Sequence, residues 1–136
     1  MRMLVRQKPA EMAGMSGCLR FFGALAVLTM VGIYCAIPRP TRDQTTLQAI
    51  AAESQHLLAV RAPGESTNLP KEKWPSAIAS LKPDSVIVRP GMVDITTTTD
   101  FDGGWGYGFA PDKQDLGMLP ECWSDLGHGV FWHDPC

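Results

Sequence analysis

One apolar stretch constrains this chain more than any other feature. Residues 21–37 read FFGALAVLTMVGIYCAI and carry no charged side chain. Cys18 and Leu19 extend the run, and Arg20 can direct its charge toward lipid head groups. The result is about 20 residues, which at about 1.5 Å each cross a hydrocarbon layer of about 30 Å. Because lipid offers the backbone no hydrogen-bond partner, the sequence predicts a transmembrane helix over residues 18–37.

Charged residues flank this stretch unevenly. Four of the 12 basic residues precede residue 21, together with only one of the 14 acidic residues. Basic flanks favour the cytoplasmic side of a membrane. The sequence therefore predicts a single-pass membrane protein. Residues 1–17 would form a cytoplasmic tail, and residues 38–136 would form an acidic domain outside the cytoplasm.

Proline residues end the predicted span. Three alternatives to an uncleaved membrane anchor are considered for this segment. Pro38 and Pro40 cannot continue a helix without losing a hydrogen bond. For a cleaved signal peptide, cutting after Ala36 would place the bulky Tyr34 where a small residue is required. A lipoprotein signal at Cys35 lacks small preceding residues, and a soluble core helix would have a polar face. We expect an uncleaved anchor, and we leave cleavage and the true start codon open.

Two helices are predicted in the outer domain. Residues 38–42 read as a stiff spacer, and the capping-box pattern of Thr41 and Gln44 starts a helix that ends near Arg61. Its apolar stripe consists of Leu47, Ile50, Ala51, Leu57 and Leu58. A second, two-turn helix is predicted with Pro75 in its first turn and Pro83 at its end, and its apolar face consists of Trp74, Ile78 and Leu81.

Extended segments fill the rest of the domain. They are rich in β-branched and aromatic residues and are separated by Pro-Gly and Asp-Gly-Gly turns. The expected strands are Ser85–Arg89, Met92–Thr99, Trp105–Phe109 and Gly129–His133. The predicted fold class is therefore α+β, with a transmembrane helix followed by two helices and a short antiparallel sheet of about four strands.

A run of alternating aromatic residues and glycines stands out among these strands. In a strand, Trp105, Tyr107 and Phe109 point to one face, and the intervening glycines point to the other. Glycines opposite an aromatic row leave room for another backbone to approach. We therefore predict that Trp105, Tyr107 and Phe109 form an interaction surface.

The pattern L-P-x-x-x-W-P-x-x-I-x-x-L-x-P-x-x-V-x-V begins at Leu69. It resembles a segment of small bacterial single-pass, membrane-anchored proteins of no known activity. In those proteins a glycine-aromatic patch like residues 103–107 and a terminal G-V-x-W like residues 129–132 tend to follow. The resemblance covers about residues 69–132. It implies a bacterial envelope protein and carries over no catalytic residue.

Four cysteines divide equally between the predicted span and the outer domain. In an oxidising compartment Cys122 and Cys136 could form a disulfide. Closing a loop of about 15 residues is worth about 3 kcal/mol in the chain-entropy model. Two free thiols are a second possibility. The third is a metal site, whose ligands would be Cys122, His128, His133 and Cys136.

Signatures of catalysis are absent from the sequence. It has no nucleophile elbow and no phosphate-binding loop, and its carboxylates show no informative pairing. The acidic outer domain argues against nucleic acid as a partner. We expect no enzymatic activity and no cofactor. The expected partners are the lipid bilayer and an envelope protein, and the oligomeric state is left open. The predicted function is a structural or protein-interaction module, with a metal-binding or redox accessory domain as the alternative.

Overall fold

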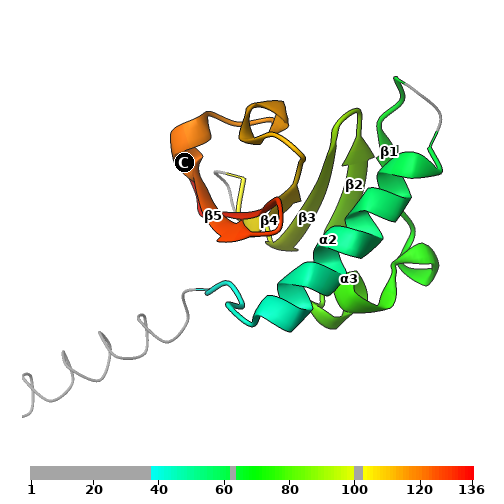
Figure 1. Ribbon diagram of the computed structural model, residues 1–136, viewed down its shortest axis with the longest axis horizontal. Helices are drawn as coiled ribbons and strands as arrows, with labels where there is room; N and C mark the ends of the chain where they lie inside the picture. Colours follow the sequence, from blue (N-terminus) through cyan, green and yellow to red (C-terminus); the bar gives the residue numbers. More distant parts are fainter. Residues whose placement is uncertain (1–37, 62–63, 100–102) are drawn as a thin grey trace, which may run out of the picture. The chain divides into compact units, whose positions relative to one another are not determined.

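An antiparallel sheet of six strands forms the centre of the computed structural model (Figure 1), in the order β1-β2-β3-β4-β6-β5. The structure describes residues 38–61, 64–99 and 103–136. The strands are β1 (Thr67–Asn68), β2 (Ser85–Arg89), β3 (Met92–Thr98), β4 (Trp105–Phe109), β5 (Trp123–Gly127) and β6 (Val130–His133). Single-turn 3-10 helices occupy Lys71–Lys73, Lys113–Asp115 and Pro120–Cys122.

The described residues form one compact unit, Pro38–Cys136. The predicted tail, residues 1–17, and the predicted span, residues 18–37, lie outside them. Neither helix in the described ranges has both the length and the apolar composition of a membrane span.

Helix α2 (Gln44–Ala59) begins two residues later than the sequence suggested. Its N-cap is Asp43, whose carboxylate accepts hydrogen bonds from the backbone N–H of Thr46 at 2.9 Å and from the Thr46 hydroxyl at 2.6 Å. Thr41 is not the cap, because its hydroxyl accepts from the backbone N–H of Asp43, at 3.3 Å, and from no N–H of the helix. The backbone N–H of Thr41 donates to the Tyr107 hydroxyl at 2.8 Å, and this bond ties residues 38–42 to strand β4.

Helix α3 (Ser76–Ser80) is short and is capped by a side chain from α2. The carboxylate of Glu53 accepts hydrogen bonds from the backbone N–H groups of Ala77 and Ile78, each at 3.0 Å. Pro75, expected in the first helical turn, is the N-cap residue. Because the first N–H groups of a helix have no partner inside it, Glu53 both stabilises α3 and joins the two helices.

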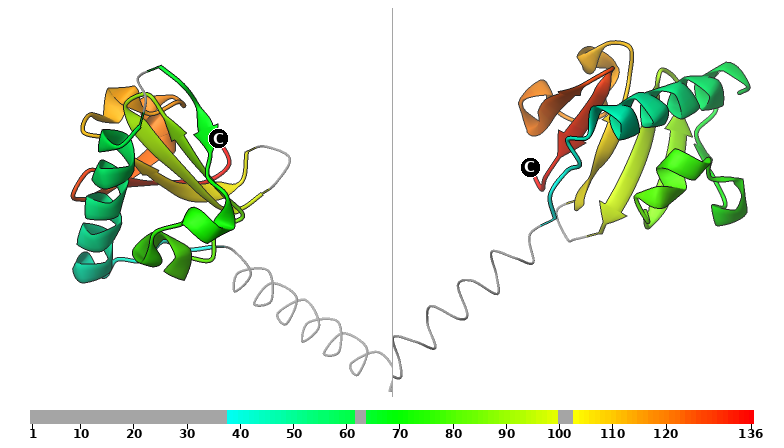
Figure 2. Two further views of the ribbon diagram at one scale, coloured as in Figure 1. Left: turned by 90° about the vertical axis from the view of Figure 1, so that its right-hand side faces the viewer. Right: turned by 60° about the horizontal axis from the view of Figure 1, so that its bottom comes forward.

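Helices α2 and α3 cover one face of the sheet (Figure 2), and the main core lies beneath them. We call this side the first face. The apolar stripe predicted for α2 packs there, with Leu47 and Ile50 fully buried. The sheet contributes Val86, Val88, Val93, Ile95, Tyr107, Phe109, Val130 and Trp132.

The aromatic side chains of β4 belong to this core, which corrects one prediction. Tyr107 is 3% exposed and Phe109 is 1% exposed, and Trp105 packs against the same cluster. The Tyr107 and Trp132 rings meet edge to face with centroids 4.9 Å apart. The three rings do share one face, as the alternation predicts. That face is covered by helices, so Tyr107 and Phe109 of the predicted interaction surface of Trp105, Tyr107 and Phe109 are buried, and Trp105 is half-buried.

The opposite side, the second face, carries a smaller apolar cluster. It consists of Met92, Ala110, Leu116, Cys122, Trp123 and Phe131, with Met118 packed against it. The glycines of β4 make this packing possible. A Cβ on Gly108 would lie 2.7 Å from Cζ3 of Trp123 and 2.8 Å from Cδ2 of Leu116. Side chains, rather than another backbone, occupy the space that the glycines leave.

The sequence underestimated the number of strands. β1 is only two residues long and pairs with the end of β2. β5 contains Ser124, Asp125 and Gly127, which are poor strand formers, and its pairing with β6 shifts register between Asp125 and Gly127. Both strands lie at the edges of the sheet, where weak strand sequences are tolerated because only one side is paired.

The glycine packing on β4 gives a test of the fold. A Cβ at Gly106 would contact the backbone oxygen of Ile95 and would lie 2.9 Å from Nε2 of His133. We expect Gly106→Ala to lower the free energy of unfolding by about 1–3 kcal/mol, measured by chemical denaturation. In the matched control, Gly117→Ala, the new Cβ meets only flexible side-chain ends, at 3.4 Å and beyond. Equal stability of the two variants would contradict this account of the second face.

Candidate binding site on the second face of the sheet

A cross-strand row of residues forms the base of the candidate site. Thr96 pairs with Gly106, Gly106 pairs with His133, and His133 pairs with Trp123. Gly106 has no side chain, so the His133 ring can lie close to β4. The His133 and Trp123 rings meet edge to face, with centroids 4.7 Å apart at 71°. Both side chains are buried.

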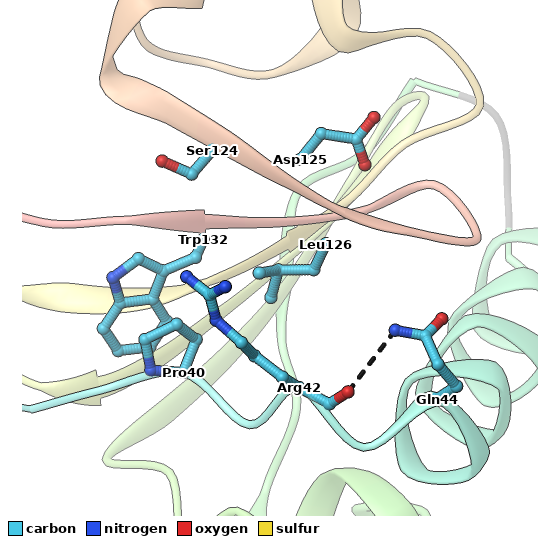
Figure 3. Close-up of a pocket in the computed structure, with 7 residues that line it drawn as sticks. All are labelled: Pro40, Arg42, Gln44, Ser124, Asp125, Leu126 and Trp132. Carbon is cyan, nitrogen blue, oxygen red and sulfur yellow. Dashed lines mark hydrogen bonds between the residues drawn. The ribbon is translucent and has the colours of Figure 1, made fainter.

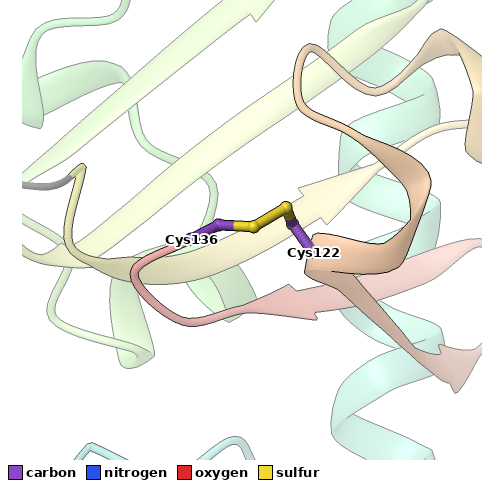
Figure 4. The surroundings of a disulfide bond; sticks show 2 residues. All are labelled: Cys122 and Cys136. Atoms are coloured by element: carbon purple, nitrogen blue, oxygen red, sulfur yellow. A yellow bond between two sulfur atoms is a disulfide. The ribbon is translucent and has the colours of Figure 1, made fainter.

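A disulfide closes the end of this row. Cys122 and Cys136 are joined in the structure (Figure 4), with their Cα atoms 5.8 Å apart, which agrees with the predicted pairing. Cys122 directly precedes Trp123, and Cys136 follows His133 by three residues. The bond therefore holds together the two chain segments that carry the aromatic pair.

The alternative metal site is not assembled. The sulfur atoms of Cys122 and Cys136 bind each other, so neither is a thiolate ligand. His128 lies in the turn between β5 and β6 with a φ of 60°, at the opposite end of β6 from His133. Residues 38–61, 64–99 and 103–136 contain no group of three or more metal-binding side chains that could hold an ion.

Beside the aromatic pair lies a cavity of about 240 Å³, which we call the second-face hollow. It combines apolar and polar residues from strands β2, β3, β5 and β6 and from the segments that precede β4 and β5. Its lining consists of Arg89, Met92, Asp94, Thr96, Gly103, Gly117, Met118, Trp123 and His133. Pockets for drug-sized ligands typically have about 300–1,000 Å³, so this hollow suits a smaller group.

An ion pair lies in the hollow. Nη2 of Arg89 is 3.5 Å from Oδ2 of Asp94, and the two side chains are 43% and 21% exposed. Charge-assisted N–H···O bonds are typically about 2.7–2.9 Å long, so this contact is loose. Burial raises the pKa of Asp94, and the positive charge of Arg89 opposes that shift. Both groups are thus accessible and incompletely paired.

Two buried nitrogen atoms of lining residues have no hydrogen-bond partner. They are Nδ1 of His133 and Nε1 of Trp123. Buried polar atoms without partners are rare in folded proteins, and each calls for an explanation. Burial lowers the pKa of His133, whereas the negative charges of Asp94 and Asp134 and the nearby backbone oxygens of Asp134 and Gly104 oppose the shift. The ring is therefore biased toward its neutral form, which has one acceptor nitrogen.

A second cavity lies on the other side of β6 and is shown in Figure 3. It measures about 320 Å³ and lies between residues 40–44 and strands β5 and β6. The side-chain amide of Gln44 donates to the backbone oxygen of Arg42 at 3.4 Å. All of its lining residues are described, and none carries a buried unpartnered polar atom. The second-face hollow is therefore the better candidate for a ligand.

Sequence reasoning singled out His133 but missed the ion pair. Asp94 stands between Val93 and Ile95, two residues that point to the other face of the sheet. A lone carboxylate in a strand rich in β-branched residues is the signal that could have marked it. Arg89 ends β2 and reaches Asp94 across the hairpin, but this pairing depends on the register of β2 and β3. Trp123 was missed because β5 was not expected.

The disulfide should stabilise the domain. We expect the double variant Cys122→Ser, Cys136→Ser to lose about 3 kcal/mol of unfolding free energy, because the unfolded chain is no longer closed into a loop. Denaturation of the oxidised protein with and without reductant provides the matched comparison. If the pair is bonded, the non-reduced Cys122–Cys136 peptides weigh about 2 Da less than the reduced ones. A full-mass peptide and a reductant-insensitive transition would refute the bond.

Burial of His133 should make stability depend on pH. Its pKa is lowered from 6.5 in the folded state, so below about pH 7 the unfolded chain binds the proton first and the free energy of unfolding falls. The raised pKa of Asp94 has the opposite effect at lower pH. There the folded state binds the proton more tightly than the unfolded chain, so the free energy of unfolding rises as the pH falls. We expect His133→Gln to reduce the fall in the free energy of unfolding between about pH 7 and pH 5, measured by chemical denaturation at each pH. His56→Gln, on the exposed side of α2, should leave it unchanged.

Comparison with known proteins adds no family assignment. No protein-family model, curated protein sequence or solved structure matches the chain. The resemblance to small membrane-anchored bacterial proteins therefore stays a prediction, and the function is argued from the described residues.

Proposed function

We propose that residues 38–136 are an extracytoplasmic binding module that residues 18–37 hold at a membrane. The observation that carries the proposal is the second-face hollow, where a loose Arg89–Asp94 ion pair lies beside buried nitrogen atoms of His133 and Trp123 that lack partners. Polar groups that are incompletely satisfied inside a small cavity gain free energy when a ligand supplies the missing hydrogen bonds.

The site rests on a rigid support, which favours binding. His133 and Trp123 belong to paired strands, and the disulfide joins the segments just beyond them. Arg89 and Asp94 lie on the β2–β3 hairpin, whose other face is buried under α2. The buried side chains of His133 and Trp123 therefore lose little conformational freedom when a ligand binds, so less of the interaction energy is spent on ordering them.

Two features support an extracytoplasmic location. Disulfides persist in oxidising compartments and are rare in the cytosol, and the Cys122–Cys136 bond is formed in the structure. The basic residues concentrated before residue 21 favour a cytoplasmic N-terminus. A bacterial envelope protein with one anchor satisfies both conditions.

An experiment in cells tests location and binding together. The full chain is fused after Cys136 to alkaline phosphatase, an enzyme that is active only outside the cytoplasm. In the same chain, without the fusion, a photo-crosslinking amino acid replaces Met118 in the hollow, or Gln48 on the exposed side of α2. We expect an active phosphatase and a light-dependent increase in intact mass for the Met118 variant alone.

A second substitution makes the cross-link specific to the site. Adding Asp94→Asn to the Met118 variant should reduce the adduct, because one charge of the ion pair is lost. An inactive phosphatase would overturn the proposed location. Equal adducts at Met118 and Gln48, or an adduct insensitive to Asp94→Asn, would overturn the proposed binding site.

A further inference from the structure

We propose that the second-face hollow binds a free α-amino acid with an apolar side chain. The inference rests on the proposed binding function and adds the chemical class of the ligand. It is argued from the ion pair of Arg89 and Asp94. A buried hydrogen-bond donor on Trp123, a buried acceptor on His133 and an apolar wall complete the hollow.

The ion pair provides the first contacts. Arg89 and Asp94 are partly exposed, and their single 3.5 Å contact is loose. A guanidinium group has five N–H donors in a planar fork and can bind a carboxylate through two parallel bonds. The Asp94 carboxylate accepts from an ammonium group. An α-amino acid carries both of these groups on one carbon atom, so it can satisfy the two protein charges at once.

The two buried nitrogen atoms offer one further hydrogen bond to each charged group of the ligand. Nε1 of Trp123 is an N–H donor and suits a ligand carboxylate, as Arg89 does. A neutral His133 ring offers an acceptor nitrogen, which suits a ligand ammonium group, as Asp94 does. Both atoms are covered by their neighbours in the structure. A ligand in the hollow therefore meets the partly exposed ion pair first, and it reaches these atoms only when the side chains that cover them move.

The remaining wall of the hollow selects an apolar side chain. Met92, Met118 and Trp123 line it together with Gly117. Methionine side chains are flexible and adapt to ligands of different shape, and Gly117 leaves the wall open. The volume of about 240 Å³ has room for one amino acid. One end of a longer peptide would bring only one charge to the ion pair and leave the other side chain uncompensated.

Calorimetric titration of the full chain in detergent micelles tests the ligand class. The probes are L-leucine, 3-methylbutylamine, which is leucine without its carboxylate, and 4-methylpentanoate, which is leucine without its ammonium group. We expect leucine to bind at least about tenfold more tightly than either the amine or the acid. The dipeptide Leu-Gly, whose charges lie further apart, should bind at least about tenfold more weakly than leucine.

Variants connect the binding to the two charges. Arg89→Met and Asp94→Asn should each weaken leucine binding by at least about tenfold, while Arg89→Lys keeps the charge and should lose less. Asp125→Asn, in the other cavity, is the matched control and should bind as the unaltered chain does. Near-ultraviolet circular dichroism of the tryptophans confirms that each variant is folded.

Several outcomes would overturn the inference. They are equal binding of leucine and its amine or acid, unchanged binding in Arg89→Met and Asp94→Asn, and no binding of leucine at about 10 mM. If leucine fails to bind but the Met118 adduct still forms in cells, the ligand class is wrong and the binding function stands. If leucine binds and the phosphatase is inactive, the location is wrong and the ligand class stands.

Discussion

Close packing against β4 is the constraint on which both faces of the domain depend. The strand alternates aromatic side chains toward the helices with glycines toward the second face. Larger residues at Gly106 or Gly108 would collide with His133, Trp123 or Leu116. Because the glycines are small, a domain of modest size buries side chains on both sides of one sheet. The second layer makes the hollow, and the first layer supplies most of the core.

The disulfide and the ion pair contribute to the hollow in different ways. The Cys122–Cys136 bond lies beyond β5 and β6, whereas Arg89 and Asp94 lie on the β2–β3 hairpin. The two charges line the hollow, whereas the covalent link lies outside its lining and joins the segments that carry Trp123 and His133. The charged side is the one that can rearrange, since those side chains are partly exposed and loosely paired.

Much of the fold could be predicted because it follows local patterns. A single helical period predicts the apolar stripe from Leu47 to Ala51 and the apolar face that contains Ile78. A single strand period predicts the strands Ser85–Arg89 and Trp105–Phe109. The covered face of Trp105, Tyr107 and Phe109 could not be predicted, since alternation shows which residues share a face and not what lies on it. The ion pair was missed because it depends on the register of two strands, and β5 was missed because an edge strand needs little intrinsic propensity.

The hydrogen bond from Thr41 to the Tyr107 hydroxyl has a mechanical consequence. Tension on the chain at Pro38 reaches the interior of the sheet through this bond before it reaches α2, because Thr41 precedes the helix cap at Asp43. The Tyr107 ring packs on Trp132, so a pull would be passed directly to β6, the strand that carries His133. A pull at Pro38 would therefore load strand β4, and through it the strand beside the hollow, before it loads helix α2.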